Sequence, residues 1–447
     1  MPDAPAGCTA GCTANHTEDR MDDDTTDGTA HETEHEMDDT TPAPERTDVC
    51  VIGGGPAGLS LALGLARDGH RVTVLEQSAR FDRSFRGESL SPDGVWLLDR
   101  LGVLDTIGER GALTVQRLEI SEGGTTVFAT EFEQFRFPRR FPMEIPQPTL
   151  LRALAEAAAE YPGFTLQHGC TALELLESDG VVTGVRYRGP DGPRELTAAL
   201  VVGADGRYSK VRTMSGLDAT IRPLDRDVVW LRLPRPDGWD PAAYRIRLDR
   251  ARHALFIPTY PDDIRIGFNI PKGGLKELRR SGIGELHRRI DELAPELAGP
   301  LRDTVTGWAG TTVLDIFTAT VPRWSRPGLV LIGDSAHTLT PILGQGVNHA
   351  LIDGHTLAGL LAAPLRAAGE RRRALVDTAL LRFQDERENA VRVSRGLQLR
   401  QERAFTFGSR AAVAARSGLY RALGSSPYLQ RRMLGSAYFQ LQRELAA

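Results

Sequence analysis

The chain has 447 residues, and its hydrophobic content of 41% can supply sizeable cores for two domains or one large one. No apolar run approaches the ~20 residues that a membrane-spanning helix needs, so no membrane span is expected. No secretory signal is visible, and the four cysteines (Cys8, Cys12, Cys50 and Cys170) form neither a disulfide framework nor a zinc pattern. We therefore expect a cytoplasmic protein without a bound metal or a nucleic-acid partner.

Residues 1–46 differ in composition from the rest of the chain. They contain thirteen Asp or Glu and two Arg, so the remainder carries a net charge of about +6 although the whole chain carries −5. The segment has almost no large apolar residues and cannot bury enough surface to offset its chain entropy. We expect it to be a disordered acidic tail.

The first folded motif expected is a βαβ unit. The apolar run 49–52 is typical of a buried parallel strand, 56–68 of a helix with small residues against the sheet, and 71–75 of a second strand. The sequence between the first strand and the helix reads GGGPAG, which indicates a dinucleotide-binding turn.

Each glycine of this turn has a separate task. Gly53 permits the tight bend, Gly55 lets the backbone approach a pyrophosphate, and Gly58 lets the helix pack closely on the strand. The helix N-terminus favours the negative charge of the phosphates. Glu76 ends the second strand eighteen residues after Gly58, where an acid hydrogen-bonds a ribose. An acid there disfavours a 2′-phosphate, which leaves NAD or FAD as the occupant of this fold.

The middle of the chain alternates helices with strands and then becomes all β. Periodicity predicts helices over 93–101 and 147–160, strands over 181–187 and 200–203, and an antiparallel sheet from 228–233, 244–248, 254–258 and 264–270. Another buried parallel strand is expected over 329–332, and the chain is expected to be helical beyond Asn348. Trp230 and Phe268 are expected in the core or in a pocket wall.

Two later stretches distinguish FAD from NAD. Residues 200–212 read LVVGADGRYSKVR, and residues 329–353 read LVLIGDSAHTLTPILGQGVNHALID. In both, an apolar strand runs into an acid and a turn of small residues, so Asp205 and Asp334 are expected at the carboxyl edge of the sheet, facing a ligand. No second glycine fingerprint for a separate nicotinamide domain occurs.

Together with the glycine turn, these stretches resemble the FAD-dependent aromatic hydroxylases of the p-hydroxybenzoate hydroxylase type, which are single-component flavoprotein monooxygenases. The resemblance covers roughly residues 47–361. It implies an α/β fold, with a Rossmann-like FAD-binding domain interrupted by a mainly antiparallel β-sheet substrate domain and followed by a helical C-terminal segment. The corresponding boundaries are 1–46 for the tail, 47–219 and 323–365 for the FAD-binding domain, 220–322 for the substrate domain and 366–447 for the C-terminal helices.

The resemblance also implies two groups of FAD contacts. The first serves the phosphates, the riboses, the adenine and the ribityl chain: Gly53, Gly55, Pro56, Ala57, Gly58, Glu76, Gln77, Arg86, Gln147, Ala172, Asp205 and Asp334. The second lies at the isoalloxazine edge: Pro341, Gly344, Gln345, Gly346, Val347 and Asn348. There, backbone N–H groups at the start of the last helix would stabilise negative charge on the reduced flavin.

Individual roles follow the same resemblance. Arg86 would reach the pyrophosphate and ribityl region, Gln147 the ribityl-phosphate chain, and Asp334 the ribityl hydroxyls. The backbone near Ala172 would pass the adenine, and Asp205 would serve a turn linked to both the flavin and the pyridine nucleotide. A surface position for Arg86 and a helix cap for Gln147 remain the alternatives.

The implied activity is an FAD-dependent monooxygenation. NAD(P)H would reduce the flavin, dioxygen would form a flavin hydroperoxide sheltered from water, and an aromatic or polyketide-like small molecule would be hydroxylated. Secondary metabolism, such as antibiotic biosynthesis, is the expected setting. The pattern assigns no catalytic base and no oligomeric state.

Three alternatives remain open from the sequence. The first is a flavin-dependent reductase or dehydrogenase acting on an alkene or amine, and the second is a flavin-binding protein without turnover. The third is a halogenase, because a Gly-Glu-Ser run follows Arg86 as it does in halogenases. The lysine that halogenases use is absent, since no lysine precedes Lys210.

Overall fold

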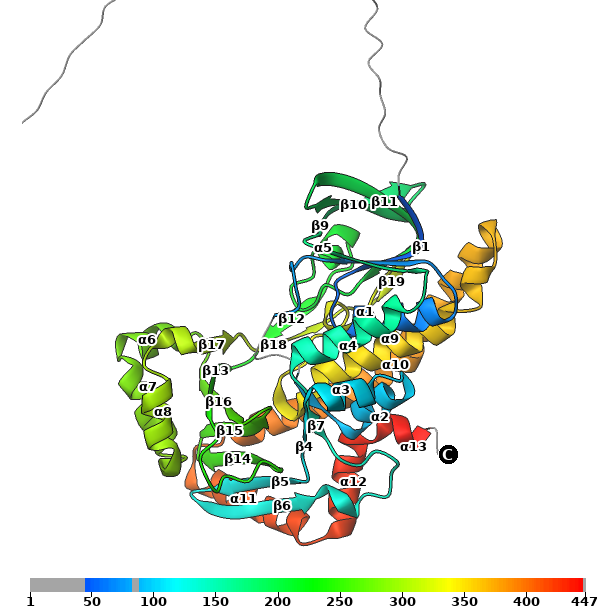
Figure 1. Cartoon of the computed structure of the whole chain (residues 1–447). Helices are drawn as coiled ribbons and strands as arrows, with labels where there is room; N and C mark the ends of the chain where they lie inside the picture. The colour runs from blue at the N-terminus through cyan, green and yellow to red at the C-terminus, as the bar shows by residue number, and fades with distance from the viewer. Residues whose placement is uncertain (1–44, 83–87, 445–447) are drawn as a thin grey trace, which may run out of the picture. The chain divides into compact units, whose positions relative to one another are not determined.

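The computed structural model describes residues 45–82 and 88–444. Of the expected acidic tail, only residues 45 and 46 are described, and they begin the first strand. The predicted α/β architecture is present, with two large sheets, helices on their faces and a helical C-terminal segment (Figure 1). No helix in the described ranges is both long and apolar enough to cross a membrane.

An eight-stranded sheet organises the nucleotide-binding half. Its main path runs β19-β20-β11-β1-β2-β8, and β9 and β10 extend it as an antiparallel addition to β11. The pairs β20–β11, β11–β1, β1–β2 and β2–β8 are parallel, so their carboxyl ends meet at one edge. The strand bounds are β1 Glu45–Ile52, β2 Val72–Glu76, β8 Phe164–His168, β9 Thr171–Ser178, β10 Val181–Gly189, β11 Gly192–Gly203, β19 Ser325–Arg326 and β20 Leu329–Leu331.

Closely packed helices cover this sheet. Helix α1 (Pro56–Arg67) is buried along most of its length because its residues are small or aliphatic, and it contacts α9 (Gln345–Leu361) and α4 (Gln147–Ala159). A Cβ added at Gly64 of α1 would lie 2.6 Å from the Cβ of Ala358. The two central helices therefore pack so closely at this point that only glycine fits. Figure 1 shows α1, α9 and α4 side by side below the parallel strands. Helices α2 (Pro92–Arg100) and α3 (Leu104–Arg110) flank them, and α5 (Lys210–Ser215) packs against β9 and β20.

A seven-stranded sheet forms the second half, in the order β17-β13-β16-β15-β14-β5-β6. Its neighbours are antiparallel except for β14 and β5, which run parallel. The bounds are β5 Arg117–Glu122, β6 Thr125–Glu131, β13 Arg226–Pro234, β14 Ala243–Asp249, β15 Arg252–Thr259, β16 Asp263–Pro271 and β17 Thr311–Leu314. Hairpin β5–β6 therefore brings residues from within 47–219 to the sheet expected over 220–322.

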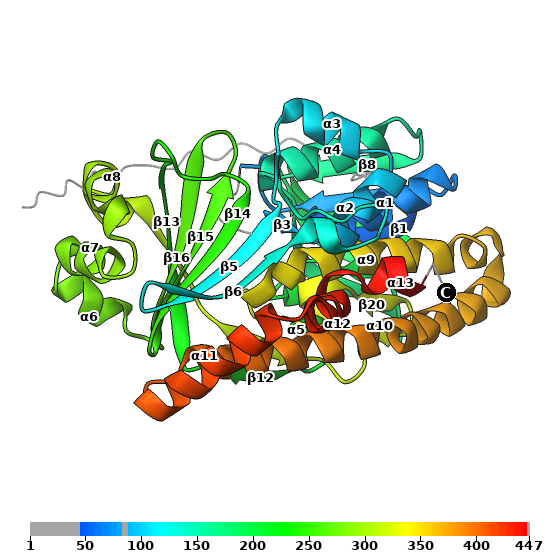
Figure 2. The same ribbon diagram turned by 90° about the horizontal axis from the view of Figure 1, so that it is seen from below.

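The two faces of this sheet differ in what covers them. Alternate residues such as Val229, Phe256 and Ile266 pack under helices α6 (Leu275–Arg280), α7 (Ile283–Asp291) and α8 (Ala298–Thr304). The intervening residues, including Trp230 and Ile257, face the other way. Figure 2 shows the three helices on the outer side of the strands, away from the nucleotide-binding half. The inner face is thus left to the site described below. Phe268 lies in the core under the helices.

Smaller elements connect the halves. A three-stranded sheet has the order β3-β7-β4, and β12 pairs with β18. The bounds are β3 Ser89–Leu90, β4 Leu113–Thr114, β7 Met143–Glu144, β12 Thr220–Pro223 and β18 Phe317–Thr320, with 3₁₀ turns at Phe132–Gln134, Pro295–Leu297, Trp308–Gly310, Gly333–Ser335, Ile342–Gly344 and Pro364–Arg366.

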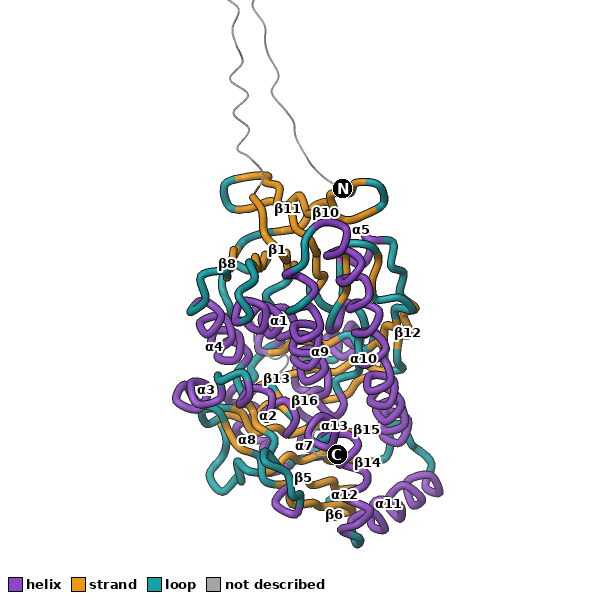
Figure 3. Tube along the Cα trace, turned by 90° about the vertical axis from the view of Figure 1, so that its right-hand side faces the viewer, coloured by secondary structure: helices purple, strands orange, loops and turns teal. Residues whose placement is uncertain are grey.

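The C-terminal segment is helical as expected. It consists of α10 (Gly369–Phe405), α11 (Arg410–Gly424), α12 (Pro427–Tyr438) and α13 (Gln440–Glu444). Although rich in arginine, these helices bury aromatic residues such as Tyr420, Tyr438 and Phe439 against Phe128 of β6. Figure 3 follows α11 and α12 past the ends of β5 and β6. The C-terminal helices therefore cover the end of the seven-stranded sheet that β5 and β6 form.

Candidate active site

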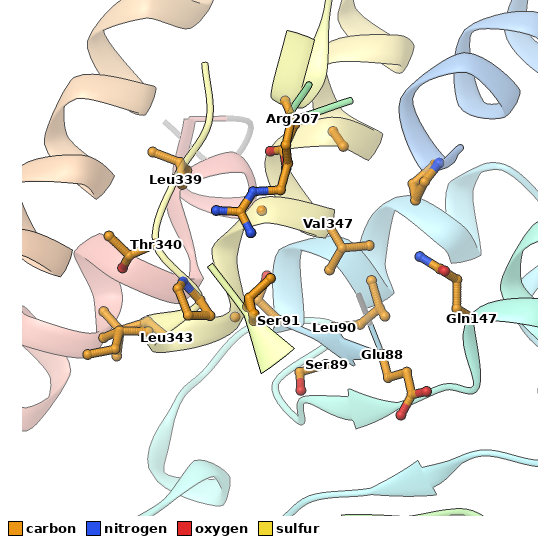
Figure 4. A pocket seen from close by; sticks show the side chains of 18 of the residues that line it. Glu88, Ser89, Leu90, Ser91, Gln147, Arg207, Leu339, Thr340, Leu343 and Val347 are labelled. Atoms are coloured by element: carbon orange, nitrogen blue, oxygen red, sulfur yellow. The ribbon is translucent and has the colours of Figure 1, made fainter. Parts of the chain in front are cut away.

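A cavity of about 1080 Å³ lies where the two large sheets and the C-terminal helices meet. One end is bordered by the glycine turn and the ends of the parallel strands, and the other by the inner face of the seven-stranded sheet and by α10–α12. Figure 4 shows residues 88–91 along one side of the pocket and Leu339, Thr340 and Leu343 on the opposite side. One continuous space therefore contacts both halves of the molecule.

The glycine turn has the geometry that its sequence predicts. Gly53 has φ +113°, and a Cβ there would lie 2.4 Å from the carbonyl oxygen of Ala204. A Cβ at Gly58 would lie 2.1 Å from the carbonyl oxygen of Gly53, so only glycine allows α1 to start this close to β1. Gly55 borders the cavity, and a Cβ there would meet nothing within 4 Å. The turn thus leaves open space at the position that a pyrophosphate would approach.

Glu76 ends β2 at the cavity wall and binds the turn directly. Its Oε2 accepts a hydrogen bond from the backbone N–H of Gly54 at 2.8 Å, and its Oε1 accepts one from Ser78 N at 2.8 Å. A carboxylate can accept several hydrogen bonds, so this residue type suits a ribose hydroxyl as well as backbone donors. Glu76 therefore orders the turn as well as facing the cavity.

Asp205 connects two of the three motifs. Its carboxylate accepts hydrogen bonds from Lys210 N (2.7 Å) and Val211 N (3.0 Å) at the start of α5, where the helix dipole favours an anion. It also accepts one from Ser335 Oγ at 3.1 Å. Asp205 borders the cavity, and its bonds hold the turn after β11 against the turn after β20.

A buried network supports the turn that carries Asp334. Asp334 faces the cavity, while Gly333 N donates to Asp353 Oδ2 at 2.8 Å. His337 Nε2 (2.6 Å) and Arg387 Nε (2.8 Å) also bind the Asp353 carboxylate. Burial by itself would raise the pKa of Asp353, but His337 and Arg387 lower it below its usual range. His337 is therefore held in a buried hydrogen-bond network with Asp353.

The loop before α9 borders the cavity through its backbone. Leu343 and Gly344 have positive φ values of 65° and 59°, which turn the chain into the N-terminus of α9. Asn348 accepts from Ser91 N at 2.9 Å and donates to the carbonyl oxygen of Gly344 at 2.8 Å. It thereby joins this loop to residues 89–91, which form the opposite wall.

The structure places most of the residues expected at the site around this cavity. Those that border it are Gly53, Gly55, Pro56, Ala57, Glu76, Gln77, Gln147, Ala172, Asp205, Asp334, Pro341, Gly344, Gly346 and Val347. Gly58, Gln345 and Asn348 do not border it and act through packing or hydrogen bonds within the loop. Arg86 lies outside the described residues.

Two sets of cavity residues were not predicted from the sequence. One is a buried charged cluster in which Arg265 binds Glu88 and Glu144, with Tyr244 beside them. The other comes from the C-terminal helices: Leu397, Arg400, Gln401, Ala404, Phe405, Phe407, Ala415, Arg416, Leu419, Tyr420, Leu423, Met433, Leu434, Ala437 and Tyr438. In the sequence, the Gly-Glu-Ser run was the one signal for the charged cluster. The apolar stripe of the C-terminal helices was a signal for their cavity residues.

The chemistry of the cavity wall fits FAD. Besides the open space at Gly55, the N-termini of α1 and α9 border the cavity, and each favours negative charge. Arg207 points into the pocket in Figure 4, and its Nε and NH2 atoms are buried without a hydrogen-bond partner among the described residues. The guanidinium also stacks on the ring of Phe317, 4.6 Å from its centroid, and its position on the cavity wall is compatible with an anionic ligand. Within 45–82 and 88–444, no group of three or more His, Cys, Asp or Glu side chains is placed to hold a metal.

Comparison with known proteins identifies the family. The family model described as an FAD binding domain matches residues 46–392. A curated relative, 6-methylpretetramide 4-monooxygenase of Streptomyces rimosus, is 37% identical over 377 residues, which covers 83% of this chain and 87% of the relative. This chain is a member of the FAD-dependent aromatic monooxygenases. The family, the enzyme class and the FAD cofactor expected from the sequence are therefore confirmed.

Solved structures give the same fold for this monooxygenase. PqsL of P. aeruginosa, solved with 2-aminobenzoylacetate, has a TM-score of 0.71 at 24% identity and covers 86% of this chain and 100% of that one. The p-nitrophenol 4-monooxygenase PnpA of Pseudomonas putida DLL-E4 has a TM-score of 0.71 at 20% identity and covers 88% and 98%. The expected fold class is thus confirmed.

Proposed function

We propose that this monooxygenase uses NAD(P)H and dioxygen to hydroxylate a polycyclic aromatic, polyketide-like small molecule. The observation that carries the proposal is the single cavity, which joins the glycine turn and the loop 341–347 to the inner face of the seven-stranded sheet. A flavin ring at the loop and a substrate under the sheet would share one space. Filled by the two ligands, that space would leave little room for water at the reacting atoms.

The nucleotide end would hold FAD. Gly53, Gly55 and the start of α1 would take the pyrophosphate, and Glu76 a ribose, while Gln147, Ala172 and Asp205 border the same end of the cavity. Pro341, Gly344, Gly346 and Val347 would lie against the isoalloxazine ring, with Asp334 near the ribityl chain. FAD would supply the redox chemistry: reduction by NAD(P)H and activation of dioxygen. In this division, residues 47–219 and 323–365 bind the cofactor.

The substrate end would bind an extended apolar molecule. Its walls are Leu118, Ile120 and Phe128 of the β5–β6 hairpin, Trp230, Leu255 and Ile257 of the sheet, and aromatic residues of α10–α12. Apolar walls with few polar groups bind by burial and orient by the polar groups. The relative named for 6-methylpretetramide supports a polyketide-like substrate, and secondary metabolism as the setting. Residues 220–322 and 366–447, together with the hairpin, would form this end.

Isotope labelling tests the proposal directly. FAD-loaded protein is incubated with NADPH or NADH, ¹⁸O₂ and a panel of polycyclic phenols, and products are analysed by mass spectrometry. Substrate-stimulated NAD(P)H oxidation with one ¹⁸O atom in the product is the expected result, and the cytoplasm, which holds the NAD(P)H pool, is the expected place of the reaction. Turnover without label would indicate a reductase or dehydrogenase, and absence of stimulated oxidation with every candidate phenol would contradict the proposal.

A further inference from the structure

A buried cluster of charged side chains lies in the wall between the expected flavin loop and the substrate sheet. Glu144 of β7 is 1% exposed, and Arg265 of β16 is 3% exposed. Arg265 NH1 donates to Glu88 Oε2 at 2.6 Å, and Arg265 NH2 donates to Glu144 Oε2 at 3.1 Å. Tyr244 of β14 donates its hydroxyl hydrogen to Glu144 Oε1 at 2.7 Å. The two oxygens of Glu144 are thus bound by two different strands of the substrate sheet.

Tyr244 stands between Glu144 and the cavity. Tyr244, Glu88 and Arg265 border the cavity, whereas Glu144 does not. A ligand in the cavity can therefore touch the Tyr244 side chain, and Tyr244 connects it to the carboxylate behind. Ser89, which pairs with Glu144 in the small sheet, would lie 3.2 Å from a Cβ on Gly344, so the cluster adjoins the loop expected to face the flavin.

The three other cavity tyrosines lack this arrangement, and one of them, Tyr438, packs against the ring of Phe132. Tyr420 accepts a hydrogen bond from Gln401 Nε2 at 2.7 Å, which is an amide and not a base. Tyr208 donates to Asp315, but it is 63% exposed and open to water. Among the described tyrosines of the cavity, Tyr244 combines burial of its partner carboxylate with access to the ligand space.

We propose that Tyr244 and Glu144 form a proton-accepting pair for a phenolic or enolic hydroxyl of the substrate, with Arg265 fixing Glu144 in position. This inference rests on the proposed hydroxylation. The substrate O–H bond breaks and its proton passes to Tyr244 Oη, while the hydroxyl proton of Tyr244 passes to Glu144 Oε1. The net result is the transfer of one proton from the substrate to Glu144, and no electrons are transferred. The negative charge moves from Glu144 to the substrate oxygen, which makes the ring more nucleophilic.

The surrounding charges suit this exchange. Burial raises the pKa of Glu144 to about 7, although Arg265, Ser89 and Tyr244 oppose the shift and Glu88 adds to it. Burial, together with Glu144, raises the pKa of Tyr244 well above its usual value, and Tyr438 adds to the shift while Arg265 opposes it. Arg232 of β13 approaches Glu88 at 3.7 Å on the outer side of the cluster. Tyr244 therefore stays a neutral hydroxyl, and Glu144 takes up a proton near neutral pH.

A pH-jump experiment on the FAD-loaded protein tests the pair without turnover. The probe is alizarin, a polycyclic phenol whose colour changes on ionisation, and its ionisation is followed by stopped-flow absorbance when bound to wild type, Tyr244→Phe or Glu144→Gln. We expect both variants to ionise the bound probe roughly 10²-fold more slowly than wild type, the lower end of what a positioned base contributes. The control is Tyr428→Phe, which removes a hydroxyl from a tyrosine that is 63% exposed and does not border the cavity, and it should ionise the probe at the wild-type rate.

Ionisation at the wild-type rate in Tyr244→Phe would overturn the proposal, and this variant decides alone if Glu144→Gln fails to fold. Equal slowing in Tyr428→Phe would also overturn it, since the effect would then not belong to the cavity.

Steady-state kinetics supply a second readout. The kcat/KM for hydroxylation should rise with pH through about 7 in wild type, because the base must be deprotonated. In Glu144→Gln it should fall by roughly 10²-fold and lose this rise; an unchanged pH profile would contradict the proposal. The probe experiment needs neither dioxygen nor NAD(P)H. Rapid ionisation of alizarin without ¹⁸O in the product would support the proton-accepting pair and refute the proposed hydroxylation. Incorporation of ¹⁸O without faster ionisation of alizarin in wild type than in Tyr244→Phe would support the hydroxylation and refute the pair.

Discussion

The nucleotide end and the substrate end of the cavity hold their buried acids differently. At the nucleotide end, each carboxylate binds at least one backbone N–H group: Glu76 binds Gly54 N, Asp205 binds Lys210 N, and Asp353 binds Gly333 N in addition to the side chains of His337 and Arg387. At the substrate end, Glu144 binds other side chains, those of Tyr244 and Arg265.

The path of the backbone therefore helps to hold the carboxylates of the nucleotide end, whereas individual side chains hold Glu144. Backbone donors are present whatever the neighbouring residue type, so the nucleotide end depends on glycines and on chain path. Side-chain partners disappear with one substitution, and a buried charge left alone is costly. The substrate end should therefore respond more sharply to point mutation and to pH, and four experiments can break or sharpen that contrast.

The largest effect is expected for Arg265→Met. This change leaves Glu88 and Glu144 buried without their shared cation, and breaking a buried ion pair in this way costs about 3–5 kcal/mol of the free energy of unfolding. Urea denaturation measures it. The matched control is Arg232→Met on the adjacent strand, since Arg232 pairs with Arg265 in the sheet register but is part-exposed and 3.7 Å from Glu88. Equal losses in both variants would remove the contrast between the two ends.

A steric test of the nucleotide end comes next. Gly58→Ala places a Cβ 2.1 Å from the carbonyl oxygen of Gly53, so α1 must move away from β1 at a cost of about 3 kcal/mol, the scale of overpacking. Gly55→Ala is the control in the same turn, because its Cβ meets nothing within 4 Å and the apoprotein should keep its stability. Thermal unfolding of both apoproteins distinguishes them, and similar melting temperatures would refute the packing role of Gly58.

The pH dependence of stability should change in Glu144→Gln. The folded protein keeps the Glu144 proton up to about pH 7, whereas an unperturbed glutamate loses it near 4.5. The folded state thus binds more protons in this window, so this group makes stability fall as pH rises from 4.5 to 7, by at most about 1.4 kcal/mol per pH unit. Urea denaturation at several pH values should show this slope in wild type and in the control Glu156→Gln, an exposed glutamate, and a smaller slope in Glu144→Gln. An unchanged slope would place the titration elsewhere.

The smallest effect is expected for Glu76→Ala. Loss of its bond to a ribose hydroxyl should weaken FAD by about 1–3 kcal/mol, the scale of an unpaired buried polar group. Fluorescence titration of the apoprotein with FAD measures this, with Glu156→Gln as a surface control. Wild-type affinity would show that Glu76 serves the turn alone.

The fold around the nucleotide end could be predicted from the sequence because its determinants are local. The bend at Gly53 and the acid at Glu76 lie on one βαβ unit. This unit and the later stretches 200–212 and 329–353, in this order, indicated the fold and FAD. Glu144, Tyr244 and Arg265 lie on strands far apart in the chain, and no spacing rule connects them. Their meeting depends on the register of the seven-stranded sheet, which carries Tyr244 and Arg265, and on the contact of that sheet with β7 of the three-stranded sheet, which carries Glu144.

The cavity residues of the C-terminal helices could not be predicted from the sequence for a related reason. An apolar stripe on a helix indicates that something is buried, but it does not say whether the neighbour is protein core or ligand space. Tyr420 and Phe405 border the cavity and also belong to the core cluster with Phe128, so one pattern serves both purposes.

Helix α10 has a consequence for engineering this enzyme. Its first half supplies Arg387 to the Asp353 network beside the flavin loop, and its second half supplies Gln401 and Phe405 to the substrate wall. Glu402 also forms a buried ion pair with Arg226 at the start of β13. A chimera that exchanges the C-terminal segment with a relative to alter substrate choice would therefore have to join within α10, after Arg387, and carry a partner for Arg226 along with the new wall.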